Sequence, residues 1–289
     1  MLEIPRDVEY VLWTLIRNGY ETYLVGGCVR DFVMGIQPRD YDICTTATID
    51  KVKSLFESVV PIGGKHGTVT VVMDDNRIEV TSLKIDGNIK IAIYEDLCTR
   101  DFTMNAMAMD VSGEIWDPLR GRDDIERRLI RAVGEPHHRF HEDALRMLRA
   151  IRFSCKLLFS IDKRTLDNIE AYSILIKTVS TERVREELNQ ILLSDYPGHG
   201  LRLLHRWGLL QYIIPELCRC VGFDQNNIYH DKDVFEHTIT VLESVPAELD
   251  LRLAALLHDI AKPQTFNGGH FYGHNVEGAN MATDILKRL

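Results

Sequence analysis

Two aspartates within residues 39–43, Asp40 and Asp42, are spaced so that they could hold a divalent metal ion. In a strand, residues i and i+2 point to the same face roughly 6–7 Å apart, so the two carboxylates would meet at one spot. Aspartate is depleted in strands and like charges repel, so we expect a cation there. Mg²⁺ is the natural candidate, since one or two carboxylates plus substrate phosphates commonly hold it. Glu79 could add a third carboxylate, although an exposed glutamate on the wet side of its strand is equally consistent with the pattern.

A pair of glycines, Gly26 and Gly27, lies between a predicted strand and a predicted helix that carries Arg30. Glycines allow the backbone to approach a phosphate closely, and an arginine one turn later could bind the same anion. A Gly-Gly turn alone is more often structural. The segment therefore predicts an anion site only in combination with other motifs.

The stretch 120–152 contains nine arginines and no lysine, which favours a role for the planar guanidinium in binding phosphates or base edges. Asp143 and Arg146 lie three apart on a helix predicted over 142–158, so we expect them side by side on one face. A carboxylate accepts and a guanidinium donates, a pattern that complements cytosine and adenine and opposes uracil and guanine. The alternatives are a solvated arginine face and a surface ion pair worth about 0.3–0.5 kcal/mol.

These residues need elements that position them, and the sequence predicts an α+β region followed by helices. We expect a helix over 5–18, strands over 22–25, 41–45, 67–73 and 77–83, and helices up to residue 34 and over 48–57. From about residue 105 the pattern is almost wholly helical. Boundaries are predicted within 110–121 and 220–231, where glycine, proline and asparagine cluster.

Composition limits the class of protein. The chain has 289 residues, 34 Lys+Arg against 43 Asp+Glu and a formal net charge of −9, with 45% hydrophobic and 27% charged residues. This length favours two or more folding units, and the acidic total argues against non-specific binding of polyanions. We find no membrane segment or secretory signal, and the six cysteines form no C-x-x-C pair, so we expect a cytoplasmic protein.

Five ordered motifs resemble those of class II tRNA nucleotidyltransferases and bacterial poly(A) polymerases. They are residues 24–31, the Asp40-x-Asp42 pair, residues 100–106 (Arg-Asp-Phe-Thr-Met-Asn-Ala), the run 123–134, and residues 142–146 (Glu-Asp-Ala-Leu-Arg). The resemblance implies a polymerase-β-like catalytic head over 1–112 and a helical neck and body over 113–220. The implied reaction is attack of a tRNA 3′-hydroxyl on the α-phosphate of CTP or ATP, with pyrophosphate leaving.

The resemblance also implies roles for individual residues. Asp40 and Asp42 would hold Mg²⁺, and Glu79 is the third catalytic carboxylate that its strand position allows. Gly26, Gly27 and Arg30 would hold the triphosphate, and Arg100 and Asn105 would contact the phosphate and sugar of the nucleotide. Asp143 and Arg146 would choose C and A without a nucleic-acid template, and Arg149 and Arg152 would lie at the same nucleotide pocket.

One departure from the family pattern concerns the segment 82–95. Relatives with full CCA-adding activity usually carry a flexible loop there that is longer by about ten residues and contains arginine. Lys84 and Thr99 also stand where arginines are common. In this family a short loop is associated with enzymes that add CC, so the sequence predicts CC addition over full CCA addition.

The C-terminal segment, 221–289, resembles HD-domain phosphohydrolases through His237, the pair His258-Asp259 and His274. Imidazole plus carboxylate would suit a transition metal. Such domains take a further aspartate from a later helix, and only Asp284 is available, so we expect a shortened sequence. The histidines could equally be helix caps and core hydrogen bonders.

Three other functions stay open on the sequence alone. A poly(A) polymerase would accept ATP alone. A metal-dependent phosphohydrolase would use the terminal histidines and only bind RNA with the head. A third alternative is an RNA-binding protein without catalytic activity.

Overall fold

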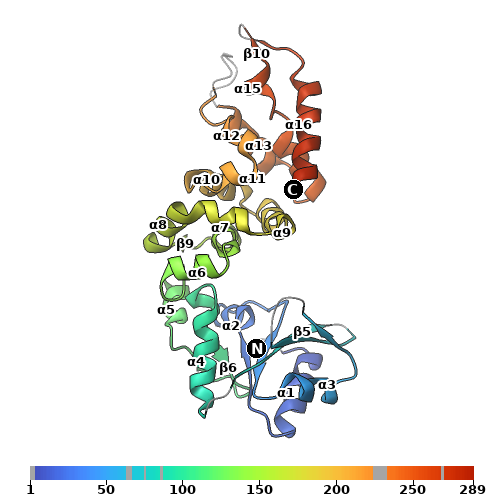
Figure 1. Ribbon diagram of the computed structural model, residues 1–289, viewed down its shortest axis with the longest axis vertical. Helices are drawn as coiled ribbons and strands as arrows, with labels where there is room; N and C mark the ends of the chain where they lie inside the picture. The colour runs from blue at the N-terminus through green and yellow to red at the C-terminus, as the bar shows by residue number, and fades with distance from the viewer. Residues whose placement is uncertain (1–3, 63–66, 75, 85–86, 224–232, 268–269) are drawn as a thin grey trace. The chain divides into compact units, whose positions relative to one another are not determined.

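The computed structural model describes residues 4–62, 67–74, 76–84, 87–223, 233–267 and 270–289. The chain divides into two compact units, Met1–Gly134 and Glu135–Leu289 (Figure 1). The first unit mixes strands and helices and the second is mainly helical, which confirms the predicted α+β class. Residues 113–134, assigned from sequence to the helical neck, lie in the first unit. The division of functions among three domains stays a prediction.

The first unit is built on one mixed sheet. Its strands are β1 (Thr22–Val25), β2 (Asp42–Thr45), β3 (Val59–Pro61), β4 (Thr68–Val72), β5 (Arg77–Ser82), β6 (Ala108–Met109) and β7 (Ile115–Trp116), in the order β3-β4-β5-β2-β1-β6-β7. The other elements of this unit are α1 (Arg6–Arg17), α2 (Gly27–Val33), α3 (Ile49–Leu55), α4 (Ile89–Thr99), the 3₁₀ turn η1 (Thr103–Asn105), α5 (Gly121–Glu126) and the short strand β8 (Leu129–Ile130). The strands and helices predicted within residues 5–83 are thus confirmed, whereas β3 was not predicted.

The register of three neighbouring strands determines where the acidic residues lie. Antiparallel pairing of β1 with β2 places Val25 opposite Asp42, and parallel pairing of β2 with β5 places Asp42 opposite Glu79. The next residues along these strands, Ile43 and Val80, are fully buried. Because side chains alternate along a strand, this burial directs Asp42 and Glu79 to the opposite face of the sheet.

The second unit consists of short helices in sequence. They are α6 (Pro136–Glu142), α7 (Leu145–Leu157), α8 (Lys163–Tyr172), η2 (Ser173–Thr178), α9 (Thr181–Leu192), α10 (Pro197–Arg206), α11 (Leu210–Ile213), α12 (Pro215–Cys218), α13 (Val234–Ser244), α14 (Leu249–Leu257), α15 (Lys262–Thr265) and α16 (His274–Arg288), with the strands β9 (Ser160–Ile161), β10 (Phe266–Asn267) and β11 (His270–Phe271). A Cβ added at Gly200 of α10 would clash with the Ile191 side chain and lie 2.8 Å from the Cys155 sulfur. This glycine therefore lets α10 pack tightly against α7 and α9.

Two sequence-based placements were wrong in detail. The helix expected over 142–158 is the end of α6 and the whole of α7, separated by Asp143 and Ala144, and the backbone of Asp143 is extended (φ −153°, ψ 102°). Asp40 was expected on a strand with Asp42, but β2 begins at Asp42 and Asp40 is exposed before it. The ladder stops there because β1 ends at Val25, opposite Asp42, and the chain turns away at Gly26. Within the described residues, no helix has the length and apolar character needed to cross a membrane.

Candidate functional site

Two acidic residues of the first unit, Asp42 and Glu79, lie beside the turn that follows β1. Asp42 and Glu79 are direct neighbours on parallel strands, and both side chains are partly exposed. Asp40 lies two residues earlier and is exposed, outside the strand. Strand register thus makes Asp42 and Glu79 neighbours. Asp40 is linked to them only because it lies two residues before Asp42 in the sequence.

Gly26 is the point at which this turn has no room for a side chain. Its φ of +83° lies in the left-handed region that favours glycine. A Cβ added there would lie 2.6 Å from Nη1 of Arg100 and 3.2 Å from Oδ2 of Asp42. A carboxylate and a guanidinium therefore approach the backbone at the same place, which the glycine alone permits.

Arg100 carries its charge within this cluster. Its Nε and Nη2 donate to Oδ2 of Asp96, at 3.1 and 3.0 Å. Burial disfavours the charged guanidinium, but the carboxylates of Asp96 and Asp42 outweigh it and raise the pKa of Arg100 above its ordinary value. A fixed positive charge next to Asp42 suits an anionic ligand such as a phosphate.

Arg30 and Asn105, both predicted to contact the nucleotide, are joined to each other. Nη1 of Arg30 donates to Oδ1 of Asn105 at 2.8 Å, and Nδ2 of Asn105 donates to Oδ1 of Asp101 at 3.0 Å. Arg30 is only 4% exposed and also donates to Oδ1 of Asp31. This chain of hydrogen bonds fixes the orientation of the Asn105 amide. Phosphate binding by Arg30 and Gly27 stays a prediction.

The donor set at the turn is of the kind that binds Mg²⁺. Carboxylate oxygens from Asp42 and Glu79 are the hard ligands that this ion prefers, and Mg²⁺ usually completes its shell with water and substrate phosphates. In the described structure, the carboxylate oxygens of Asp40, Asp42 and Glu79 do not all lie within 4.8 Å of one another. The residues therefore fit an ion shared with a bound nucleotide better than a site enclosed by protein.

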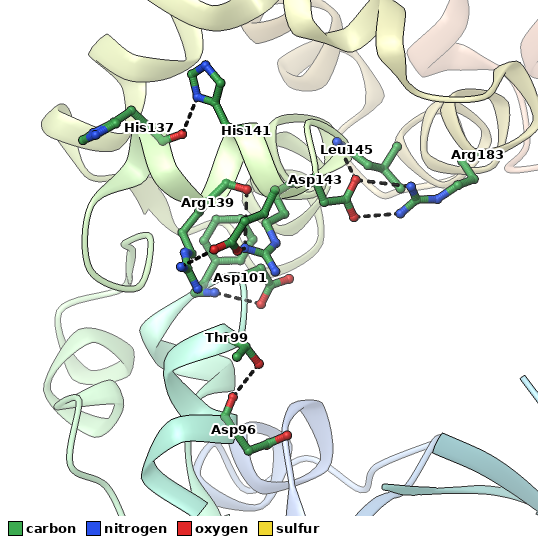
Figure 2. Close-up of polar contacts among 12 residues, drawn as sticks. Asp96, Thr99, Asp101, His137, Arg139, His141, Asp143, Leu145 and Arg183 are labelled. Atoms are coloured by element: carbon green, nitrogen blue, oxygen red, sulfur yellow. Dashed lines mark hydrogen bonds and ion pairs between the residues drawn. The ribbon is translucent and has the colours of Figure 1, made fainter. Parts of the chain in front are cut away.

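In the second unit, Asp143 lies in the break between α6 and α7. Nη1 and Nη2 of Arg183, on α9, donate to its carboxylate at 3.2 and 2.7 Å, and the Leu145 N–H donates to it at 3.1 Å (Figure 2). Arg146 instead donates to Oε2 of Glu142 at 2.9 Å. The expected pair on one helix face is thus corrected, because the extended backbone at Asp143 turns its carboxylate toward α9.

Arg149 and Arg152 share an acidic partner from α9, Glu187. Nε of Arg152 donates to Oε2 of Glu187 at 2.6 Å, and Nη1 of Arg149 lies 3.8 Å from Oε1 of the same carboxylate. Arg152 and Glu187 are 9% and 6% exposed, so this is a buried ion pair. Both guanidinium groups also lie over the Phe153 ring. Their contact with a nucleotide stays a prediction.

Three of the four predicted ligands in the C-terminal segment come together. His237, His258 and Asp259 have ligand atoms within 4.8 Å of one another, the only such group among the described residues. Nζ of Lys262 lies 2.7 Å from Oδ2 of Asp259, so an ammonium already occupies the carboxylate that a metal would use. His274 is not part of the group, and its Nδ1 lies 2.8 Å from the Phe271 carbonyl oxygen. The donors suit a transition metal, in competition with Lys262.

Sequence reasoning missed the acidic and basic partners of the predicted site residues. Asp96 and Asp101 lie within or next to the motif at 100–106, so local spacing could have identified them. Arg183 and Glu187 lie 40 and 35 residues from Asp143 and Arg152. Nothing in the local pattern connects residues that far apart.

Comparison with known proteins covers most of the chain. Residues 22–131 match a family model described as the poly A polymerase head domain, residues 158–220 match "Probable RNA and SrmB-binding site of polymerase A", and residues 230–289 match the HD domain. The CCA-adding enzyme of Geobacillus thermodenitrificans is 42% identical over 214 residues, 70% of this chain and 53% of that protein. The CCA-adding enzyme of Bacillus pumilus is 42% identical over 205 residues, 67% of this chain and 51% of that protein.

Solved structures agree with these matches. The crystal structure of the Bacillus stearothermophilus CCA-adding enzyme in complex with CTP is 28% identical, with a TM-score of 0.65 over 99% of this chain and 82% of that chain. The present chain spans about half the length of the curated relatives it matches. With the three domains in the same order and the ordered motifs of the head and helical region in place, the chain belongs to the class II tRNA nucleotidyltransferase and poly(A) polymerase family.

Proposed function

We propose that the protein is a tRNA 3′-terminal nucleotidyltransferase that adds C, as CC, from CTP, depends on Mg²⁺, uses no nucleic-acid template and releases pyrophosphate. The observation that carries the proposal is the strand register that places Asp42 beside Glu79 at the Gly26 turn, with Arg100 against the same glycine. The names of the similar proteins support the substrate class.

In the proposed reaction the protein mainly binds and orients the reactants. Asp42, with Glu79 and Asp40, would hold Mg²⁺, which neutralises the triphosphate and favours the deprotonated 3′-hydroxyl. The turn at Gly26 and Gly27 and the charge of Arg100 would position the phosphates. Asn105, held by Arg30 and Asp101, would meet the sugar.

Selection of the base would fall to the carboxylate of Asp143 and the guanidinium of Arg146. Arg183 holds Asp143 through two hydrogen bonds, and Glu142 holds Arg146 through one. Each group is thus oriented by a separate partner, which restricts the hydrogen bonds that it can make with an incoming base. A fixed acceptor and a fixed donor match cytosine and adenine.

The choice of CC over CCA rests on the short connection between β5 and α4. β5 ends at Ser82 and α4 begins at Ile89, capped by the side chain of Asn88. Residues 85–86 of this connection lie outside the described residues. Few residues are available there to change the pocket from C to A, so addition of the final A would need a partner enzyme.

The proposed location is the cytoplasm, where tRNA ends are processed.

The experiment that tests the function supplies Mg²⁺ and a tRNA without its CCA end, with CTP alone, ATP alone or both. Two added nucleotides in each lane with CTP would support CC addition. Three added nucleotides when ATP is also present would indicate full CCA addition, and long tails with ATP alone would indicate a poly(A) polymerase. No extension in any lane would reject nucleotide transfer.

A further inference from the structure

A cavity in the second unit is lined by none of the predicted site residues. It has a volume of about 350 Å³ and is bordered by the end of α7, the turn into β9, α8 and one face of α10. This size is near the lower end for small-ligand pockets, roughly 300–1,000 Å³. All of its lining residues belong to the described part of the chain.

The cavity combines apolar walls with cationic and neutral polar groups. Phe159, Leu166 and Leu203 supply apolar surface, and Leu158 is 50% exposed. No carboxylate is among the lining residues, although the protein as a whole is acidic. An apolar cavity that contains a guanidinium and excludes carboxylates suits a ligand with a flat apolar part and a negative charge.

Trp207 and Arg206 provide the flat surface and the charge. The Arg206 guanidinium carbon lies 5.2 Å from the centroid of the Trp207 ring. The indole Nε1 is buried and has no hydrogen-bond partner among the described residues. Burial of an unpaired donor opposes folding, so phenylalanine would serve a purely structural role at least as well. Tryptophan offers a larger surface on which a base can stack.

His199 adds a hydrogen-bond acceptor. The hydroxyl of Ser154 donates to the Phe159 carbonyl at 2.8 Å, so it accepts from Nε2 of His199 at 3.0 Å. Burial, with a smaller effect of Arg202, lowers the pKa of His199 and so favours the neutral ring. The remaining ring nitrogen, Nδ1, is therefore an acceptor that an exocyclic amino group or a ribose hydroxyl could satisfy.

We infer that this cavity binds one unpaired nucleotide of the RNA substrate, with its base against Trp207, its phosphate at Arg206 and a donor group at His199. The inference rests on the proposed function for the identity of the RNA. The match of residues 158–220 to an RNA-binding family model includes most of the lining and favours RNA over a free nucleotide.

The test measures binding of the full chain to a dye-labelled tRNA minihelix with an unpaired 3′ segment, by fluorescence anisotropy. We expect Trp207→Leu to weaken binding roughly 5- to 100-fold, the effect of one lost base stack, and Trp207→Phe to retain most of it. The unpaired nucleotides are also replaced one at a time by abasic sites. At one position this replacement should lower the RNA affinity of the unsubstituted protein, and the same replacement should not change the RNA affinity of Trp207→Leu. Arg206→Gln should lower the salt dependence of binding.

The matched control is Tyr196→Leu, which removes an aromatic ring that is 44% exposed and does not line the cavity. Thermal unfolding of each variant checks the fold. Unchanged RNA affinity in folded Trp207→Leu and Arg206→Gln would overturn the inference. It would also be overturned if Trp207 were needed for binding of free CMP but not for binding of RNA.

Nucleotide incorporation separates this inference from the proposed function. With CTP in excess, Trp207→Leu should raise the KM for tRNA and leave kcat unchanged. If the unsubstituted protein extends no tRNA but its RNA binding depends on Trp207, the proposed function is rejected and RNA binding in the cavity is supported. Normal extension without any effect of Trp207 would reject the cavity alone.

Discussion

The Gly26 turn of the first unit and the arginine-rich helix α7 of the second unit hold their charged groups in different ways. At the turn, backbone geometry brings Asp42, Glu79 and Arg100 together, through strand register and a glycine without room for a side chain. At α7 and the break before it, Arg152 and Asp143 are oriented by ion pairs with Glu187 and Arg183 of α9, a helix that follows about 40 residues later in the chain. The first arrangement should therefore be sensitive to backbone substitutions, and the second to loss of a distant partner.

The largest effect is expected from Asp42→Asn. Removing one charge from the proposed magnesium site should lower CTP incorporation by at least about 10³-fold, because electrostatic stabilisation of the transferred phosphoryl group is worth several kcal/mol. Single-turnover extension of tRNA measures this loss. Asp50→Asn, an exposed aspartate in the first turn of α3, is the control and should be fully active. Comparable activity of the two variants would contradict the role of Asp42.

Glu187→Gln should have the largest effect on stability. It leaves Arg152 buried without a carboxylate, a change that typically costs about 3–5 kcal/mol in free energy of unfolding. Urea unfolding measures the loss. The double variant Arg152→Met/Glu187→Leu should recover most of it, since no buried charge then lacks a partner. A loss below about 1 kcal/mol for Glu187→Gln would show that the pair does not organise this helix.

Gly26→Ala and Gly35→Ala separate backbone strain from crowding at the turn. Both glycines have positive φ, +83° and +71°, but only a Cβ at Gly26 would meet Arg100 and Asp42. Gly35→Ala should lose stability on the order of 1 kcal/mol, and Gly26→Ala should lose more because its Cβ would also crowd Arg100 and Asp42. Only Gly26→Ala should lose about 100-fold in kcat/KM for CTP, because displaced side chains would misplace the phosphates. Equal activities would indicate that the turn is merely structural.

Arg183→Gln tests the long-range partner of Asp143. The variant weakens the bidentate hydrogen bonds that orient the carboxylate, so we expect about a 10-fold lower ratio of CTP to UTP incorporation. Competition between labelled CTP and UTP measures the ratio. Arg185→Gln, on the same helix but bonded to the Leu289 carbonyl, is the control. An unaltered preference in folded Arg183→Gln would assign base selection to other groups.

Much of the first unit follows from the sequence alone. Alternating apolar residues predicted β1, β2, β4 and β5, and the glycines marked the turn correctly. These features are local, because side-chain alternation and turn preference act over a few residues. The motifs also placed Asp42, Arg100 and Asn105 within one candidate site, and Asp101 could have been added from the same short motif.

Tertiary structure alone decided the partners. Asp40 lies outside the strand because β1 ends opposite Asp42, a fact of register that depends on two strands at once. Asp143 pairs with Arg183, and Arg152 with Glu187, because α9 packs against α7. His274 is not part of the group formed by His237, His258 and Asp259. It is the first residue of α16, so its position depends on where that helix packs. Sequence spacing specifies neighbours along the chain, whereas the partner of a charge depends on which elements pack together.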